Sequence, residues 1–214
     1  RRNPNMKYFF ASDIHGSSFY TKKIIEKYKE SNASKLVLLG DLLYHGPRND
    51  LPKDYCPKEV FAMLNEYKDS IIAVRGNCDS EVDQMVLDFP MQSDYCIGIF
   101  NDIYFFITHG HIYGEDHMPK LAKGSAFIYG HVHLPIAKKS GDIYILNPGS
   151  ASLPKEQNPN SYAILDDDIF TIYDLDGDVL KAMISPKSKT EGYTLKEMTK
   201  PLQEPTCGLE RPKE

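Results

Sequence analysis

Five short segments of the chain combine metal-binding side chains with the end of a predicted strand. Among them, two Asp, one Asn and four His offer oxygen and nitrogen atoms that suit divalent metal ions. The segments are Asp13-Ile14-His15, Gly40-Asp41, Gly76-Asn77-Cys78-Asp79, His109-Gly110-His111 and Gly130-His131-Val132-His133. Two divalent ions roughly 3.5–4 Å apart are a common device for hydrolysing phosphate esters. These segments therefore favour a centre that holds two metal ions.

The type and spacing of the residues suit such a centre. Asp13 and His15 are two positions apart, so an extended backbone would direct both side chains to one ion. The carboxylate of Asp41 has two oxygens and can bridge two cations, and Asn77 offers a neutral oxygen. The histidines supply nitrogens that suit Mn, Fe, Zn or Co. With few thiols nearby, a structural zinc site is disfavoured.

The segments must be positioned by a sheet, because each follows an apolar strand-like run. Loops at the carboxyl ends of strands are the usual place for sites in open α/β sheets. Glycines beside the ligands let the backbone turn sharply there. Strands are predicted at Lys7–Ala11, Leu36–Leu39, Ser70–Val74, Ile103–Thr108, Phe127–Tyr129, Asp142–Leu146, Tyr162–Leu165, Phe170–Tyr173 and Val179–Ile184.

Helical spacing is confined to the first half of the chain. Apolar residues recur at helical intervals from Phe19 to Tyr28 and again after Pro57, which suits a first helical turn. Ser80 can cap a third helix whose inward residues would be Val82, Val86 and Phe89. A βαβ first half and a strand-rich second half predict an α/β fold of two packed sheets with helices outside.

Length and composition bound the class of protein. The 214 residues suit one full domain, expected at residues 6–185, and residues 186–214 form a charged tail or docking arm. Such a tail would become ordered by packing on a neighbouring chain, so we expect a homo-oligomer. The net charge of −5 gives no basic surface for nucleic acid, although a small nucleotide substrate stays open.

The cysteines and apolar runs indicate a cytoplasmic protein. The four cysteines lie far apart without a C-x-x-C pair, which favours reduced thiols over a disulfide framework. The longest apolar runs are strand-length, well short of the ~20 residues of a membrane span. No signal peptide is visible at the start. We therefore expect no membrane partner.

The five motifs resemble, in their order and spacing, the calcineurin-like metallophosphoesterases. The strings Ala11–Ser17, Gly40–Asn49, Val74–Ser80 and Asn147–Ser150 resemble the YfcE-type bacterial phosphodiesterases in particular. The resemblance covers about residues 6–184 and leaves out the tail. It implies a four-layer α/β/β/α sandwich of two mixed sheets, the metallo-dependent phosphatase fold.

The resemblance also implies a ligand set and a reaction. One ion would be held by Asp13, His15, Asp41 and His133, and the other by Asp41, Asn77, His109 and His131. The ions would be divalent, with Mn²⁺ expected first and Zn, Fe, Co or Ni as alternatives. A hydroxide bridging them would attack a small phosphodiester, which makes the chain a phosphodiesterase that hydrolyses small phosphate esters.

Further roles fall on residues beside the ligands. Many members of the superfamily carry His at position 78, which helps to protonate the leaving oxygen, whereas this chain has Cys78. That leaves the general acid open between Cys78 and His111, although His111 also suits a supporting loop histidine. Asn77 and Asp79 join Cys78 and His111 as candidate catalytic residues, and Asp79, two positions after Asn77, is expected to support the ligands. Arg75 and His45 are the candidates for substrate contacts, with a surface ion pair and a loop position as the alternatives.

Two other functions stay open at this point. One is a phosphomonoesterase that uses the same centre, which the sequence does not separate from a diesterase. The other is a non-catalytic scaffold resembling the retromer subunit of this fold, in which the first motif's His would be altered. His15 is present here, which favours an enzyme.

Overall fold

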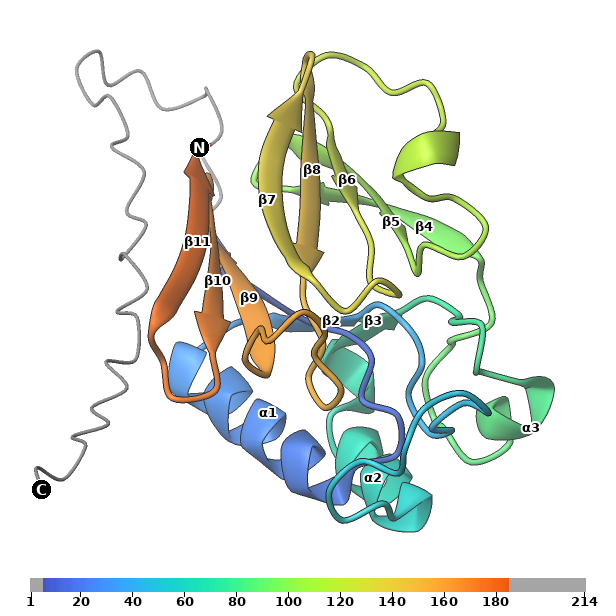
Figure 1. Cartoon of the computed structure of the whole chain (residues 1–214). Coiled ribbons are helices and arrows are strands. Elements are labelled where there is room, and N and C mark those ends of the chain that lie inside the picture. The colour runs from blue at the N-terminus through green and yellow to red at the C-terminus, as the bar shows by residue number, and fades with distance from the viewer. Residues whose placement is uncertain (1–5, 185–214) are drawn as a thin grey trace, which may run out of the picture.

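A computed structural model describes residues 6–184 of the chain, and the predicted tail at residues 186–214 lies outside them. Two mixed sheets pack face to face, as Figure 1 shows. In order across the first sheet, its strands are β11 (Val179–Ile184), β10 (Ile169–Asp174), β9 (Ser161–Asp166), β1 (Tyr8–Ala11), β2 (Lys35–Leu38) and β3 (Ile71–Ala73). In order across the second, they are β4 (Tyr95–Phe100), β5 (Ile103–Thr108), β6 (Ala126–Ile128), β8 (Ile143–Pro148) and β7 (Pro135–Ser140).

The strands that precede the ligand segments run parallel within each sheet. β1, β2 and β3 pair in parallel in the first sheet, as do β5, β6 and β8 in the second. The remaining neighbours, β9 to β11 in one sheet and β4 and β7 in the other, pair antiparallel. Parallel strands end at the same edge of a sheet, so this topology gathers the segments after β1, β2, β3, β5 and β6.

Apolar side chains fill the space between the sheets and beneath the first one. Phe10 and Val37 of the first sheet pack with Phe105, Ile107 and Leu146 of the second in one core. The opposite face of the first sheet is covered by α1 (Ser18–Ser31) and α2 (Pro57–Asn65). Alternate residues of β1 and β2 therefore serve two cores, which is why both strands carry apolar side chains on both faces.

The outer face of the second sheet has a thin cover. The segment between β5 and β6 lies over Phe106, Phe127 and Ile145 and contains the 3₁₀ helix η2 (Glu115–His117). Within residues 6–184, this segment takes the place of α-helices in the fourth layer. The predicted α/β sandwich of two mixed sheets is confirmed. No helix in this described range is long and apolar enough to cross a membrane.

The helix predictions are confirmed for the first two helices and partly wrong for the third. Ser17 caps α1 by accepting a hydrogen bond from the Tyr20 amide, and Pro57 opens α2. Ser80 caps α3 (Glu81–Gln84) as predicted, and its amide donates to Asp83 Oδ2 in a capping box. That helix has a single turn, so its periodicity ends early. Val82 and Val86 are therefore exposed, whereas Phe89 is buried as predicted, together with Leu87.

Two strands, β4 and β7, were not predicted. β7 begins with Pro135 and carries two lysines, and both features are tolerated because it lies at a sheet edge. The 3₁₀ helix η1 (Lys68–Ser70), which leads into β3, was not predicted either. Cys56, Cys78 and Cys96 form no disulfide among the described residues, and Cys207 lies outside them.

Candidate metal centre

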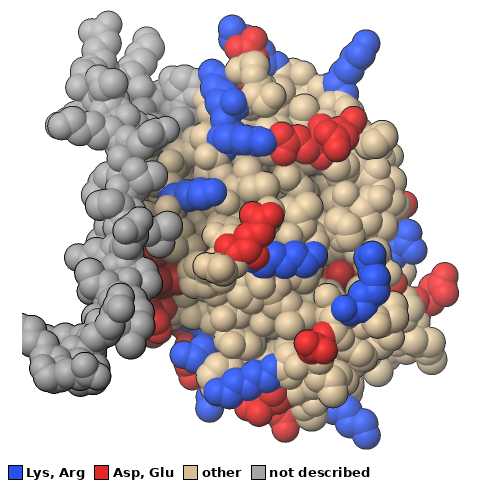
Figure 2. All heavy atoms as spheres, viewed as in Figure 1, with Lys and Arg blue, Asp and Glu red and all other residues tan. Residues whose placement is uncertain are grey.

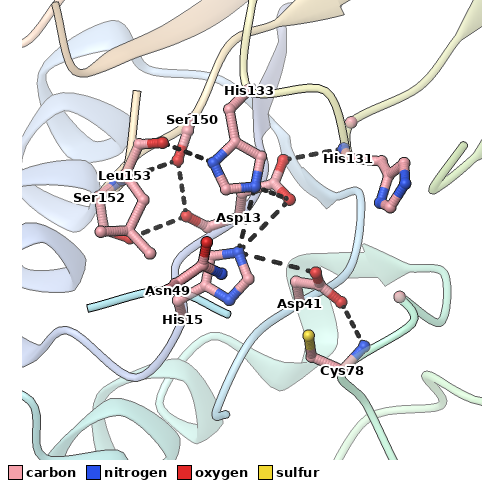
Figure 3. Close-up of polar contacts among 12 residues, drawn as sticks. Asp13, His15, Asp41, Asn49, Cys78, His131, His133, Ser150, Ser152 and Leu153 are labelled. Carbon is pink, nitrogen blue, oxygen red and sulfur yellow. Dashed lines mark hydrogen bonds and ion pairs between the residues drawn. The ribbon is translucent and has the colours of Figure 1, made fainter. Parts of the chain in front are cut away.

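The five ligand segments meet at one end of the two sheets. The loops after β1, β2 and β3 bring Asp13, His15, Asp41 and Asn77 from the first sheet. The loops after β5 and β6 bring His109, His131 and His133 from the second. Figure 3 shows Asp13, His15, Asp41 and His133 directed toward one another, with the His131 amide bonded to Asp13 beside them. Residues separated by up to 120 positions in the chain thus form one polar group in the interior.

The first subset, which we call the Asp13 cluster, consists of Asp13, His15 and His133. Asp13 Oδ1 lies 3.3 Å from His133 Nε2 and 3.7 Å from His15 Nε2. The two imidazole Nε2 atoms are 3.3 Å apart. All three side chains are buried, with at most 4% of any side chain exposed. Three potential ligand atoms thus surround one small space.

The second subset, the Asp41 cluster, consists of Asp41, Asn77, His109 and His131. His109 Nε2 lies 3.3 Å from Asp41 Oδ2 and 3.0 Å from Asn77 Oδ1. Ligand atoms of Asp41, His109 and His131 all lie within 4.8 Å of one another. Asp41 Oδ2 is also 3.7 Å from His15 Nε2, so this carboxylate lies between the two clusters.

The hydrogen bonds of the Asp13 cluster fit a bound cation. His15 Nδ1 bonds the Tyr44 carbonyl at 2.9 Å, and His133 Nδ1 bonds the Leu153 carbonyl. A carbonyl only accepts, so both Nδ1 atoms carry the proton. The neutral rings then direct unprotonated Nε2 atoms at each other and at Asp13 Oδ1, which has no hydrogen-bond donor. A cation among these three atoms would turn mutual repulsion into coordination.

The Asp41 cluster has the same design. His109 Nδ1 bonds the Leu39 carbonyl at 2.6 Å, so its Nε2 is unprotonated in the neutral ring. That nitrogen faces the oxygens of Asn77 and Asp41, which are also acceptors. In the metal-free protein a proton on this nitrogen can join the three atoms. Once that proton leaves, three acceptors surround one space, with the imidazole orientation fixed by a backbone carbonyl, and this again fits a metal ion.

The backbone at these ligands differs from the sequence prediction. Five of them have left-handed φ angles between 50° and 64°, namely Asp13, His15, Asp41, His131 and His133. The expectation that an extended backbone would align Asp13 with His15 is therefore wrong, although the two side chains do converge. Each such residue costs about 1–3 kcal/mol and is retained only where its surroundings enforce it.

Hydrogen bonds from another loop enforce the conformation of Asp13. The hydroxyls of Ser150 and Ser152 donate to the Asp13 carbonyl at 3.0 and 2.9 Å. The amide of Leu153 donates to Ser150 Oγ, and the carbonyl of Leu153 holds His133. Figure 3 shows this arrangement. The loop after β8 thus positions two ligands of one cluster, a role for Ser152 and Leu153 that the sequence did not reveal.

Asp79 joins the loops that carry Asp41 and Asn77. Its carboxylate accepts hydrogen bonds from the backbone amides of Asp41, Leu42 and Gly76 at 2.7–2.8 Å. Burial, together with the charge of Asp41, raises the pKa of Asp79 to about 6. Because it contacts backbone and no ligand atom, Asp79 acts by positioning, in line with its expected supporting place.

Burial and charge set the protonation of the histidines in the metal-free protein. Burial lowers the pKa of His109, but its contact with the Asp41 carboxylate outweighs this and raises the pKa to about 9. Partial burial and the positive charge of His109 lower the pKa of His131 to about 4. Burial likewise lowers the pKa of His15. Burial also lowers the pKa of His133, but its contact with the Asp13 carboxylate outweighs this and raises it. The centre thus favours protons on His109 and His133 over His15 and His131.

Cys78 and His111, the two candidates for a proton donor, lie at the rim of the Asp41 cluster. Burial and the charge of Asp41 raise the pKa of Cys78 to about 12, and its amide donates to Asp41 Oδ1 at 2.8 Å. The ring of His111 is 5.4 Å from that of His109, centroid to centroid. His111 Nδ1 is buried with no hydrogen-bond partner among the described residues.

The two predicted substrate contacts lie elsewhere. The guanidinium of Arg75 pairs with Asp94, at 2.5 Å from Nη2 to Oδ1. The ring of His45 packs edge-on against Tyr44 and Tyr55. Neither residue lines the cavity of about 310 Å³ that opens beside the ligands. Arg48, Asn49 and Lys155 line it, together with ligands from both clusters, and sequence reasoning assigned them no role.

Comparison with known proteins identifies the family. A model of the calcineurin-like phosphoesterase superfamily domain matches residues 6–168. The chain belongs to the calcineurin-like phosphoesterase superfamily. It is 46% identical to phosphodiesterase YfcE of Escherichia coli over 180 aligned residues. The alignment covers 84% of this chain and 98% of YfcE. The resemblance drawn from the motifs is thereby confirmed.

Other relatives and solved structures agree with this membership. Phosphodiesterase MJ0936 of Methanocaldococcus jannaschii is 29% identical over 151 residues, 67% of this chain and 83% of the relative. The solved structure of YfcE superposes with a TM-score of 0.83 over 84% of this chain and 100% of YfcE. Zinc-bound Vps29 of Entamoeba histolytica superposes with a TM-score of 0.53 at 18% identity, over 84% of this chain and 99% of Vps29. At this identity the match shows a common fold alone.

Proposed function

We propose that this chain is a metal-dependent phosphodiesterase that hydrolyses small phosphate esters at the Asp13 and Asp41 clusters. The observation that carries the proposal is the carboxylate of Asp41, which lies within 3.7 Å of one imidazole from each cluster. A shared carboxylate between two sets of acceptors is what a dinuclear centre requires. The 46% identity to a phosphodiesterase over most of the chain supports the same reaction.

The residues of the chain would divide the work as follows. Asp13, His15, Asp41 and His133 would hold one divalent ion, and Asp41, Asn77, His109 and His131 the other. Such ions supply an activated water and neutralise charge on the phosphoryl oxygens. Asp79 and the two serines of the loop after β8 keep the ligands in place. Cys78 or His111 would donate a proton to the leaving oxygen.

The remaining expectations belong to the same proposal. Residues 6–185 would form the catalytic domain, working with manganese in the cytoplasm, where Cys56, Cys78 and Cys96 stay reduced. Basic and acidic side chains are interspersed on the face shown in Figure 2, which suits a small substrate better than a nucleic acid. Arg75 and His45 would contact substrate only after leaving their present partners. A homo-oligomer remains a prediction, to be tested by light scattering.

Hydrolysis of two chromogenic esters tests the proposal. Manganese-loaded protein should hydrolyse bis(p-nitrophenyl) phosphate faster than p-nitrophenyl phosphate. Asp41→Asn should remove both bound metal and turnover, because it takes charge from both clusters. A preference for the monoester would point to a phosphomonoesterase. No turnover of either ester by metal-loaded protein would contradict the proposal and favour a scaffold.

A further inference from the structure

Two basic side chains line the cavity beside the metal ligands and have no acidic partner. Arg48 and Lys155 are exposed at its wall, and neither forms an ion pair with another residue of the described range 6–184. Other cations of the chain are paired, such as Arg75 with Asp94 and Lys138 with Glu115. Two positive charges are therefore free to meet a ligand in this cavity.

The acidic residue of the cavity lining is already engaged. Asp41 is the one acidic residue among the described residues of the lining, and it contacts His109, His15 and the Cys78 amide. Its charge is directed into the metal centre and leaves both cations unmatched. A cation pair without a carboxylate at the mouth of a site raises the local concentration of anions.

Each cation is fixed to a ligand-bearing part of the site through its own loop. Arg48 lies in a turn closed by the Asn49 amide and the Gly46 carbonyl, and a Cβ on Gly46 would lie 3.0 Å from Cys78 Sγ. The Lys155 amide donates to the His133 carbonyl at 3.3 Å. One cation therefore belongs to the side of Cys78 and the other to the side of His133.

We propose that Arg48 and Lys155 form a subsite for a second phosphate group, so that the preferred substrates are small phosphodiesters carrying a further phosphate. This inference rests on the proposed phosphodiesterase activity and specifies its substrate class. A guanidinium matches the paired oxygens of a phosphate, and an ammonium adds a point charge. The cavity of about 310 Å³ suits a small molecule of this kind.

A matched pair of chromogenic diesters tests the subsite. Thymidine 5′-(p-nitrophenyl phosphate) and its 3′-phosphorylated form have the same scissile bond and leaving group, and differ only by the second phosphate. Manganese-loaded protein should show about a ten-fold lower KM for the 3′-phosphorylated ester. That preference should shrink in 0.5 M salt, because exposed charges are screened.

Variants assign the preference to the two side chains. Arg48→Ala combined with Lys155→Ala should reduce the ratio of kcat/KM between the two esters to about one, mainly through KM. Arg48→Glu should make the phosphorylated ester the poorer substrate. The control is Lys58→Ala, an exposed lysine on α2 outside the cavity, which should leave the ratio unchanged. Calorimetric titration with thymidine 3′,5′-bisphosphate against thymidine 5′-phosphate should show the same loss of preference without turnover.

The outcomes separate this inference from the proposed function. Suppose that all three diesters are hydrolysed, but that the ratio of kcat/KM between the two thymidine esters is the same in the wild type and in the double variant. The subsite is then refuted and the diesterase stands. If no diester is hydrolysed by metal-loaded protein, the proposed function itself fails. A ratio that Lys58→Ala lowers as much as the double variant also refutes the subsite.

Discussion

Gly76 lies against the backbone of Asp41 so closely that a side chain cannot fit between their loops. A Cβ on Gly76 would lie 2.1 Å from Asp41 Oδ1 and 2.4 Å from the Asp41 amide nitrogen, whereas ordinary contact begins near 3.4 Å. Gly76→Ala must therefore separate the two loops by about 1 Å. The same shift would disturb the Asp79 carboxylate, which accepts both amides.

The cost follows from these contacts. Overpacking of this size destabilises by about 1–3 kcal/mol, and weakening a shared charge-assisted hydrogen bond adds about 1–2 kcal/mol. At about 2–4 °C per kcal/mol for a domain of this size, Tm should fall by roughly 5–15 °C. Metal ligands must keep their distances within about 0.2 Å, so we expect manganese affinity to fall by about 100-fold.

The measurements are calorimetric unfolding of the chelator-treated protein and titration with manganese. The matched control is Gly114→Ala, because Gly114 has φ −112° and its Cβ would meet one atom, the Gly110 carbonyl oxygen, at 3.2 Å. The control should stay within about 0.5 kcal/mol of wild type. Wild-type manganese affinity in Gly76→Ala, with a Tm equal to that of the control, would refute the role of this contact.

Three further predictions concern other parts of the centre. The Asp41 carboxylate raises the pKa of His109 to about 9, so below pH 9 a proton on His109 competes with the metal. Manganese affinity should therefore rise with pH up to that value, and binding at pH 7.5 should release about one proton. Titrations in buffers of different ionisation heat that show no proton release would contradict this. The double variant Ser150→Ala, Ser152→Ala leaves the buried Asp13 carbonyl without donors, so its free energy of unfolding should fall by about 1–3 kcal/mol and its manganese binding should weaken by about ten-fold. The control Ser34→Ala alters an exposed hydroxyl and should change neither quantity. Burial and the charge of Asp41 raise the pKa of Cys78 to about 12, so in the metal-free protein the thiol stays protonated at neutral pH. Cys78→Ser should keep its metal and lose less than about ten-fold in turnover of p-nitrophenyl esters, and loss of metal would show that the thiol ligates.

The sequence predicted the ligand residues through a local signal, the polar side chain at the end of an apolar strand. Asp41 follows β2 and His109 follows β5, and parallel pairing within each sheet then brings such ends together. This inference needs only strand identity and direction. It therefore holds although the backbone at Asp13 and His15 is left-handed where an extended one was expected.

What the sequence could not show depends on contacts between distant residues. The partner of Arg75 is Asp94, 19 positions away, which no local pattern indicates. Ser152 and Asp13 are separated by 139 positions, and only the folded sheet brings the hydroxyl to the carbonyl. Lys155 likewise enters the cavity because its loop bonds His133. Candidate ligands could be proposed from type and spacing, whereas the residues that position them required the structure.

Anomalous diffraction from crystals of the manganese-loaded protein tests the central claim most directly. We predict two manganese peaks about 3.5–4 Å apart. One should contact Asp13, His15 and His133, the other Asn77, His109 and His131, with the Asp41 carboxylate between them. A single peak, or two peaks without Asp41 between them, would contradict this account of the site.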